Sequence, residues 1–164
     1  MDYKAFFERK SEDVAQDLLG RLAIRKTPSG IFAAEITETG AYRGGKITPA
    51  RQGMLYEPGR LFLMANRGYL LLNIACQGDV PACVELRELS LPFPISSPPE
   101  FDLPRTKIVG PGTISKFLHL TPEMDNLALG DELSISSEKF RIGPTSRRNL
   151  EEKADNLVGV YRFS

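Results

Sequence analysis

Short runs of apolar and β-branched residues, each bounded by glycine, proline or asparagine turns, recur along the chain and predict β-strands. These runs are 21–27, 31–42, 60–64, 69–76, 81–89 and 158–163. Turns at Pro28-Ser29-Gly30 and around Gly78 predict that the first two and the fourth and fifth of these runs form hairpins. A further hairpin is predicted from Leu133–Ile135 and Lys139–Ile142.

Helical spacing is confined to a few short segments. Val14, Ala15, Leu18 and Leu19 form the buried stripe of one helix, which Ser11 can cap and Gly20 can close. A second short helix is expected between the sequence Gly110-Pro111-Gly112 and residue 120, and another helical turn at residues 121–123.

Two segments predict irregular structure. Residues 43–60 contain four glycines and two prolines, which is typical of a loop or a functional insertion. The run from Leu91 to Pro104 contains five prolines, and we interpret it as a surface connection, not a domain boundary. The prediction is a single α+β domain over residues 1–164, with a curved, mostly antiparallel sheet and a few short helices.

Composition narrows the class of protein. The chain has 164 residues, of which 41% are hydrophobic and 26% charged, so disordered, collagen-like and coiled-coil proteins are excluded. The longest uncharged apolar stretch, Gly68–Gly78, is too short to cross a membrane. The N-terminus lacks the apolar core of a signal peptide. We therefore expect a cytoplasmic protein, associated with the nucleoid in a prokaryote, with no membrane partner.

The cysteines and the single histidine limit the chemistry. Cys76 and Cys83 fit neither a zinc site nor a disulfide framework, although they flank a turn and could face each other across a hairpin. Cytosolic thiols usually stay reduced, which argues against a disulfide. His119 alone cannot form a His-pair metal site, and we expect no metal.

Charge is balanced overall but not locally. Twenty-one basic and twenty-one acidic residues give a net charge of zero, which excludes a strongly basic nucleic-acid binder but not a basic patch. Such a patch is predicted in residues 41–70, where only Glu57 opposes five cations. These cations are Arg43, Lys46, Arg51, Arg60 and Arg67. A basic, glycine-rich segment suits a phosphate backbone, and the alternative is a solvated loop.

Nine short motifs occur in a fixed order along nearly the whole chain. They begin with Asp17-Leu18-Leu19-Gly20 and the stretch 35–42, which reads Glu-Ile-Thr-Glu-Thr-Gly-Ala-Tyr. The others are 48–54, Pro58-Gly59, Leu72-Asn73-Ile74, Gln77-Gly78 with 82–87, Gly110-Pro111-Gly112, Arg141-Ile142-Gly143 and Arg162-Phe163. In this order the motifs resemble the alkyladenine DNA glycosylases, also called 3-methyladenine DNA glycosylases of the mammalian type.

The resemblance implies a fold, an activity and a partner. It implies a single antiparallel α+β domain that binds double-stranded DNA and acts as a monomer without a metal or an organic cofactor. It implies that a wedge residue enters the base stack while a damaged purine turns out into a pocket. A carboxylate then activates the water that attacks the anomeric carbon.

The chain departs from the family pattern at four places. Gly40 occupies the position of the general-base glutamate, and the segment after Tyr42 is short and lacks the pocket histidine. Met64 stands where the family has an aromatic residue that stacks on the base. Arg67 lies at or near the position of the wedge tyrosine.

Three residues of the family pattern are retained. By resemblance, Tyr42 is a stacking face, Asn73 lies on the pocket strand, and Arg87 helps to hold the catalytic water. Each also has an ordinary structural interpretation: a half-buried aromatic at a strand end, an amide bonded to nearby backbone, and one partner of a surface ion pair.

A carboxylate elsewhere in the pocket could replace the missing one. Glu85 is the better candidate, because side-chain alternation places it on the same face as Arg87, at a position where the family usually has an apolar residue. Glu38 is the second candidate, since it shares a face with Gly40 and Tyr42 by the same alternation. The alternative is that Glu85 forms a structural ion pair with Arg87 and silences the water site.

Three functions therefore stay open. The leading hypothesis is a DNA N-glycosylase that hydrolyses the N-glycosidic bond of damaged purines in base-excision repair. The second is a catalytically silent protein that binds lesions or distorted DNA on the same scaffold. The third keeps only the fold, with a narrowed site that binds a nucleobase-like ligand and no DNA.

Overall fold

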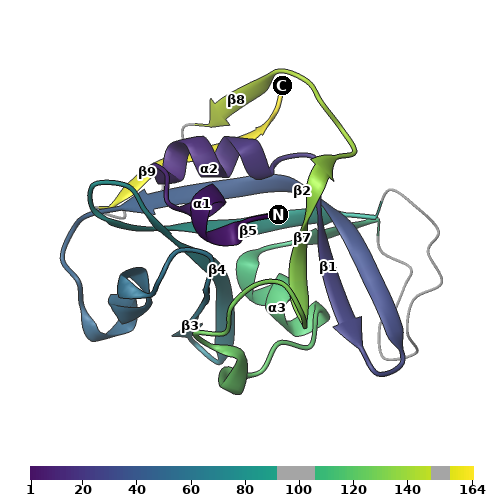
Figure 1. The fold of residues 1–164 in the computed structure, drawn as a ribbon, viewed down its shortest axis with the longest axis horizontal. Coiled ribbons are helices and arrows are strands. Elements are labelled where there is room, and N and C mark those ends of the chain that lie inside the picture. Colours follow the sequence, from purple (N-terminus) through teal and green to yellow (C-terminus); the bar gives the residue numbers. More distant parts are fainter. Residues whose placement is uncertain (92–105, 149–155) are drawn as a thin grey trace.

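The computed structural model describes residues 1–91, 106–148 and 156–164. Its strands form one antiparallel sheet with the order β3-β4-β5-β2-β1-β7, while β6 pairs with β5, β9 with β2, and β8 with β9. Strands alternate with only a few short helices, which confirms the predicted α+β class (Figure 1).

The elements follow the chain in a simple order. The strands are β1 (Arg21–Thr27), β2 (Gly30–Arg43), β3 (Leu61–Asn66), β4 (Tyr69–Gln77), β5 (Pro81–Ser90), β6 (Lys107–Val109), β7 (Leu133–Lys139), β8 (Thr145–Arg148) and β9 (Leu157–Phe163). The helices are α1 (Tyr3–Phe7), α2 (Ser11–Leu18) and α3 (Pro111–Phe117), with 3₁₀ turns η1 (Pro49–Leu55) and η2 (Pro122–Met124).

The 14-residue strand β2 is the centre of the sheet. One of its edges pairs with β1 along residues 30–35 and then with β9 along residues 38–42, while its other edge pairs with β5. Two register shifts, between Ile36 and Thr39, mark where the pairing changes. Bulges of this kind bend a strand, so β2 passes from one part of the sheet to another and gives it its curvature.

The two faces of the sheet have different surroundings. One face carries the main core, in which Leu72, Ile74, Val84 and Leu86 pack with residues of all three helices. The other face carries a small cluster of Met54, Phe62 and Cys83, with partly buried residues around it. Side chains alternate along strands, so β4 and β5 supply both faces from consecutive residues.

The helices cover the face with the main core. Helix α2 contacts β2, β5 and β9, and α3 contacts β4 and β5. Figure 1 shows α1 and α2 close together beside the central strands, with α3 below them. The predicted stripe of α2 is confirmed, because Val14, Ala15 and Leu18 have no exposed surface. None of the helices in the described residues is long and apolar enough to cross a membrane.

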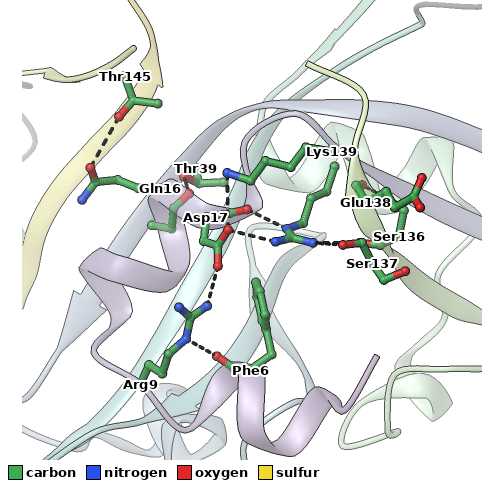
Figure 2. A network of polar contacts seen from close by, with 12 residues as sticks. Phe6, Arg9, Gln16, Asp17, Thr39, Ser136, Ser137, Glu138, Lys139 and Thr145 are labelled. Atoms are coloured by element: carbon green, nitrogen blue, oxygen red, sulfur yellow. Dashed lines mark hydrogen bonds and ion pairs between the residues drawn. The ribbon is translucent and has the colours of Figure 1, made fainter. Parts of the chain in front are cut away.

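Asp17 joins three segments through a single carboxylate (Figure 2). Its Oδ2 atom accepts a hydrogen bond from Arg9 Nη2 at 2.8 Å, and its Oδ1 lies 2.9 Å from Arg21 Nη2 and 3.3 Å from Lys139 Nζ. Burial alone raises the pKa of Asp17, but the hydrogen bonds from Arg21 and Arg9 outweigh it and lower the pKa to about 2. The carboxylate thus fixes α2 to the start of β1 and the end of β7.

The strands predicted from the sequence are confirmed apart from the hairpin at residues 133–142. That prediction was wrong: Leu133–Lys139 is one continuous strand that pairs with β1. The edge of β1 supplies the partner that the hairpin would have provided, and the polar residues taken for a turn continue the strand. Ser136 accepts a hydrogen bond from the Leu22 amide through its hydroxyl oxygen.

The helix boundaries differ in detail from the prediction. Ser11 is the first helical residue and its hydroxyl donates to Glu12, whereas Lys10 occupies the cap position without a side-chain bond. Gly20 follows the helix with a φ of 85°, the left-handed conformation that closes helices. The sequence did not predict α1, β6 or β8, which are short. Residues 92–104, nearly all of the proline-rich run, lie outside the described residues.

The two cysteines do not face each other. Cys83 lies opposite Ala75, and Cys76 lies opposite Ala82, so adjacent positions send the two thiols to opposite faces of the sheet. Both are buried and free. His119, the single histidine, is exposed just after α3 with a φ of 53°.

Replacement of Asp17 by asparagine tests the importance of this carboxylate. Because the folded pKa is depressed, its stabilising effect is present above the unfolded pKa near 4 and is lost as the pH falls toward 2. Asp17→Asn should therefore lower the free energy of unfolding by about 1–2 kcal/mol at pH 7, after allowance for solvent screening. Urea unfolding at pH 7 and at pH 3 measures the difference, which should shrink at the lower pH.

Asp79→Asn, in the exposed β4–β5 turn, is the matched control and should change stability by less than ~0.5 kcal/mol. A difference between Asp17→Asn and the wild type that stays constant from pH 7 to pH 3 would contradict an ionic role for Asp17.

Candidate active site

A cavity of about 430 Å³ opens on the face of the sheet opposite the main core. This volume lies within the ~300–1,000 Å³ typical of small-molecule sites. Its floor comes from β2, β3, β4 and β5, and its remaining walls come from η1, the start of α3 and the residue before β9. The lining residues are Tyr42, Arg51, Met54, Phe62, Met64, Asn66, Leu71, Asn73, Cys83, Glu85, Arg87, Pro111 and Asn156.

Three residues form a row across the floor of the cavity. Gly40 on β2 lies directly opposite Glu85 on β5, and Glu85 lies directly opposite Asn73 on β4. Directly opposite residues share a face of the sheet and have Cβ atoms roughly 5 Å apart. Glu85 therefore projects into the cavity one strand away from the position where Gly40 carries no side chain.

The Glu85 carboxylate is held by two neighbours. Arg87 Nη1 donates to Glu85 Oε1 at 2.9 Å, and the Tyr42 hydroxyl donates to the same oxygen at 3.4 Å. The Glu85 side chain is only 7% exposed and that of Arg87 16% exposed, so solvent screens this ion pair weakly. The geometry brings together Tyr42, Glu85 and Arg87, and side-chain alternation had predicted that Glu85 and Arg87 share a face.

Gly40 leaves the space that these side chains use. A Cβ atom at this position would lie 3.2 Å from Arg87 Cδ and 3.4 Å from Tyr42 Cε2. The arginine and the tyrosine thus close over the glycine backbone. A longer side chain here would displace the guanidinium that contacts Glu85.

The apolar walls of the cavity come from β3 and η1. Phe62 lies opposite Asn73, and Met64 lies opposite Leu71, so both face the cavity. Gly53 of η1 is pressed against the Phe62 ring so closely that a Cβ atom would overlap it. This contact holds η1, and with it Met54, over the floor. The wall at Met64 is flexible and polarisable instead of flat.

Asn73 and Cys83 form a small polar group at the back of the floor. The Asn73 amide donates to the Leu71 carbonyl at 3.1 Å, and the Cys83 thiol donates to Asn73 Oδ1 at 3.7 Å. Burial raises the pKa of the Cys83 thiol, with the Glu85 charge as a further cause. The thiol therefore stays protonated and is a poor nucleophile.

The basic segment expected between residues 41 and 70 is only partly available to a ligand. Arg43 Nε lies 3.2 Å from Glu12, and Arg60 donates to the Asn126 carbonyl at 2.8 Å. Arg51 lines the cavity, while Lys46 and Arg67 are exposed. Arg51, Lys46 and Arg67 are thus the cations of this segment that are placed to meet a phosphate backbone.

Arg67 stands at the tip of the β3–β4 hairpin in an unusual conformation. The turn consists of Arg67 and Gly68, with φ of 49° and 81°, between the paired residues Asn66 and Tyr69. Two-residue turns of this type favour asparagine and glycine, and an arginine there is strained by about 1 kcal/mol or more. Asn66 lines the cavity, so the strained tip adjoins its mouth.

Glu38, the second candidate for the missing carboxylate, does not line the cavity. Its Oε1 atom instead accepts a short hydrogen bond of 2.6 Å from Arg148 on β8. The pairing of β2 with β9 runs without a shift from Glu38 to Ala41, so Glu38 keeps the face of Gly40, but Arg148 holds its carboxylate outside the cavity. Of the two carboxylates, the structure brings only Glu85 to Arg87.

Several lining residues were not singled out from the sequence. Leu71 and Cys83 lie two residues before Asn73 and Glu85, so the same alternation could have found them. Asn156 had no such signal, because it lies outside any strand and reaches the cavity only through the pairing of the following strand β9 with β2.

Comparison with known proteins matches this arrangement to a family. The sequence model of the methylpurine-DNA glycosylase family matches residues 5–164. The chain belongs to this family. The fold of this methylpurine-DNA glycosylase family member agrees with the resemblance noted in the sequence.

Individual relatives carry names of the same kind. A protein of Ehrlichia ruminantium (strain Gardel) carries the name 3-methyladenine DNA glycosylase as an inferred function. It is 33% identical to this chain over 135 residues, which cover 76% of this chain and 66% of the relative. A protein of Aeropyrum pernix with the same name is 27% identical over 175 residues, covering 96% of this chain and 87% of the relative. The match thus spans just under two thirds of the Ehrlichia protein's length.

The shared contact of positions 40 and 85 with Arg87 can be tested by measuring the free energy of unfolding alone. Gly40→Glu places a second carboxylate opposite Glu85, and like charges in directly opposite positions are destabilising. Glu85→Leu removes one ion-pair partner of Arg87 and is destabilising as well. In the double variant the introduced carboxylate can pair with Arg87, so the losses should be less than additive by about 1–3 kcal/mol.

Urea unfolding of the four proteins measures this coupling. The control cycle uses Gly40→Ala with Glu85→Leu, which introduces no charge and should be additive within ~0.5 kcal/mol. Additivity in both cycles would show that Gly40 and Glu85 do not share the Arg87 site.

Proposed function

We propose that this family member is a DNA N-glycosylase that takes a damaged purine into the cavity and hydrolyses its bond to the sugar with Glu85 as general base. The observation that carries the proposal is the position of Glu85 directly opposite Gly40, in contact with Arg87 and Tyr42. The family name and the names of the relatives support the same activity.

The proposed reaction needs one proton acceptor. Glu85 accepts a proton from a water molecule as the water oxygen forms a bond to the anomeric carbon of the sugar. The bond from that carbon to the purine nitrogen breaks, and its electron pair leaves with the base. An alkylated purine that carries a positive charge departs as a neutral base, so it requires less assistance than a neutral lesion.

Tyr42, Met64 and Arg87 support this step in different ways. Tyr42 and Met64 come from β2 and β3 and line the same cavity, where a flat base could lie between them. Stacking on an aromatic side chain is worth ~1–3 kcal/mol per base, and Tyr42 is the residue that supplies it. Arg87 keeps the Glu85 carboxylate in place through the ion pair.

The same ion pair favours a second candidate function. With Arg87 only 2.9 Å from Glu85, the carboxylate could serve structure alone, and the protein would then bind lesions without cutting them. The proposal of a nucleobase-like ligand without DNA has less support, because Lys46, Arg51 and Arg67 stand at or near the cavity. Binding to a duplex with a steep salt dependence separates DNA binding from that third possibility.

A gel excision assay with protein in excess tests the glycosylase proposal. The substrates are duplexes with single alkylated or deaminated purines, and abasic duplex marks the product. Glu85→Gln keeps the shape but removes the base, and it should lower the single-turnover rate by roughly 10²–10⁴-fold. Glu38→Gln, away from the cavity, is the matched control and should cut at the wild-type rate.

Two results would contradict this assignment. Unchanged excision by Glu85→Gln would show that another group activates the water. Absence of excision by the wild-type protein, with preferential binding to lesion duplexes, would establish the silent lesion-binding function instead.

The hairpin tip gives a second test, which does not need catalysis. We propose that Arg67 enters the base stack at the site from which the damaged base is turned out, because its strained turn adjoins the cavity mouth. Arg67→Ala should weaken binding to a lesion duplex about tenfold more than binding to the intact duplex. Fluorescence anisotropy with both duplexes measures this ratio.

Arg60→Ala serves as the control, since this arginine lies in the same basic segment but donates to the Asn126 carbonyl. It should weaken both duplexes to the same small extent. An equal loss for both duplexes in Arg67→Ala would show that Arg67 contacts only the phosphate backbone.

A further inference from the structure

Asn156 is a buried side chain that lines the cavity and lacks a strong hydrogen-bond partner. It is only 4% exposed and immediately precedes β9. Its amide Nδ2 lies 3.7 Å from the thioether sulfur of Met54, the one partner of this amide among the described residues. A thioether is a weak acceptor, and burial of an amide without adequate hydrogen bonds is costly. A ligand in the cavity would supply the strong hydrogen-bond partner that the described part of the protein does not give to this amide.

Asn73, the other buried asparagine that lines the cavity, is bonded in a different way. Asn73 is 3% exposed, but its amide donates to the Leu71 carbonyl and its oxygen accepts from the Cys83 thiol. Both ends of the Asn73 amide are therefore engaged by the floor itself. Of the two asparagines, Asn156 has the greater unused hydrogen-bonding capacity.

The backbone fixes Asn156 beside the proposed stacking wall. The Arg43 amide donates to the Asn156 carbonyl at 3.0 Å, and the next residue, Leu157, pairs with Tyr42. Asn156 thus brings a polar group to the edge of the Tyr42 wall from the far end of the chain.

We propose that Asn156 is a specificity-determining residue, whose side-chain amide bonds the edge of a purine that carries a hydrogen-bonding group at position 6. A primary amide offers donors and an acceptor side by side, and it forms paired hydrogen bonds with the 6-amino group and N7 of adenine. Such a site rejects analogues that lack the matching group, because its buried amide is then left unpaired.

This inference rests on the proposed function, since it places a purine in the cavity, but its test needs neither DNA nor catalysis. The probes are free adenine and unsubstituted purine, which differ only by the 6-amino group, and binding is followed by NMR titration of the Tyr42 and Met64 resonances. Wild-type protein should bind adenine about fivefold to tenfold more tightly than purine, the strength of one net hydrogen bond. Asn156→Leu should reduce this ratio to about one by weakening adenine alone.

Two further variants keep the test decisive. Asn156→Asp has the same shape but no donors. It should therefore keep its affinity for adenine, whose 6-amino group donates, and lose affinity for hypoxanthine, whose 6-oxo group needs a donor. Leu157→Val changes the packing next to Asn156 at a residue outside the cavity lining and should leave the adenine preference intact. If Leu157→Val abolishes the preference as Asn156→Leu does, the amide acts only through packing and the proposal fails.

The remaining outcomes are equally clear. Wild-type protein that binds both bases equally, or neither, overturns the proposal. If the wild-type protein excises no base in the gel assay but still prefers adenine to purine, the glycosylase activity is overturned and the contact by Asn156 is supported. If the wild-type protein excises damaged purines and Asn156→Leu still prefers adenine to purine, only the role of Asn156 is overturned.

Discussion

The pairing register of β2, β5 and β4 is the constraint on which both the core and the cavity depend. It places Gly40, Glu85 and Asn73 in one row on the cavity face and sends Val84 and Leu86 into the core. A slip by one residue would exchange the two faces and bury the Glu85 charge among apolar side chains, which costs several kcal/mol. The packing that stabilises the domain therefore also fixes the chemistry of the cavity floor.

A carboxylate at position 40 or at position 85 would reach the same part of the cavity floor on the same backbone. Opposite residues of an antiparallel pair have Cβ atoms only roughly 5 Å apart, a distance that a glutamate side chain spans. Arg87 lies within reach of both Gly40 and Glu85, because its Cδ approaches the first and its Nη1 bonds the second. A carboxylate at either position needs a cation beside it, and Arg87 supplies that cation at both.

The sequence predicted the parts of the fold that depend on neighbouring residues. Runs of apolar residues between turns found the strands of the sheet, and helical spacing found the stripe of α2. The predicted hairpin at 133–142 was wrong because β1, more than one hundred residues earlier, supplies the partner of β7. Local patterns cannot show which distant edge is open.

The same distinction explains the site residues. Alternation from Arg87 led to Glu85, which lies in the regularly paired part of β5. It placed Glu38 on the face of Gly40, but it could not show that Arg148 on β8 holds that carboxylate outside the cavity. It had nothing to say about Asn156, whose approach depends on β9 joining the far edge of β2.

The floor and the walls of the cavity consequently differ in how freely they can change. Floor residues are held by the register of the sheet, and substitutions there must preserve the core on the other face. The walls come from η1 and the segment before β9, which contribute single side chains such as Met54 and Asn156. A change in these segments alters which side chains line the cavity without moving Glu85 or Arg87. Within one fold, therefore, the sheet fixes the positions of Glu85 and Arg87, and the groups beside them can change in the connecting segments.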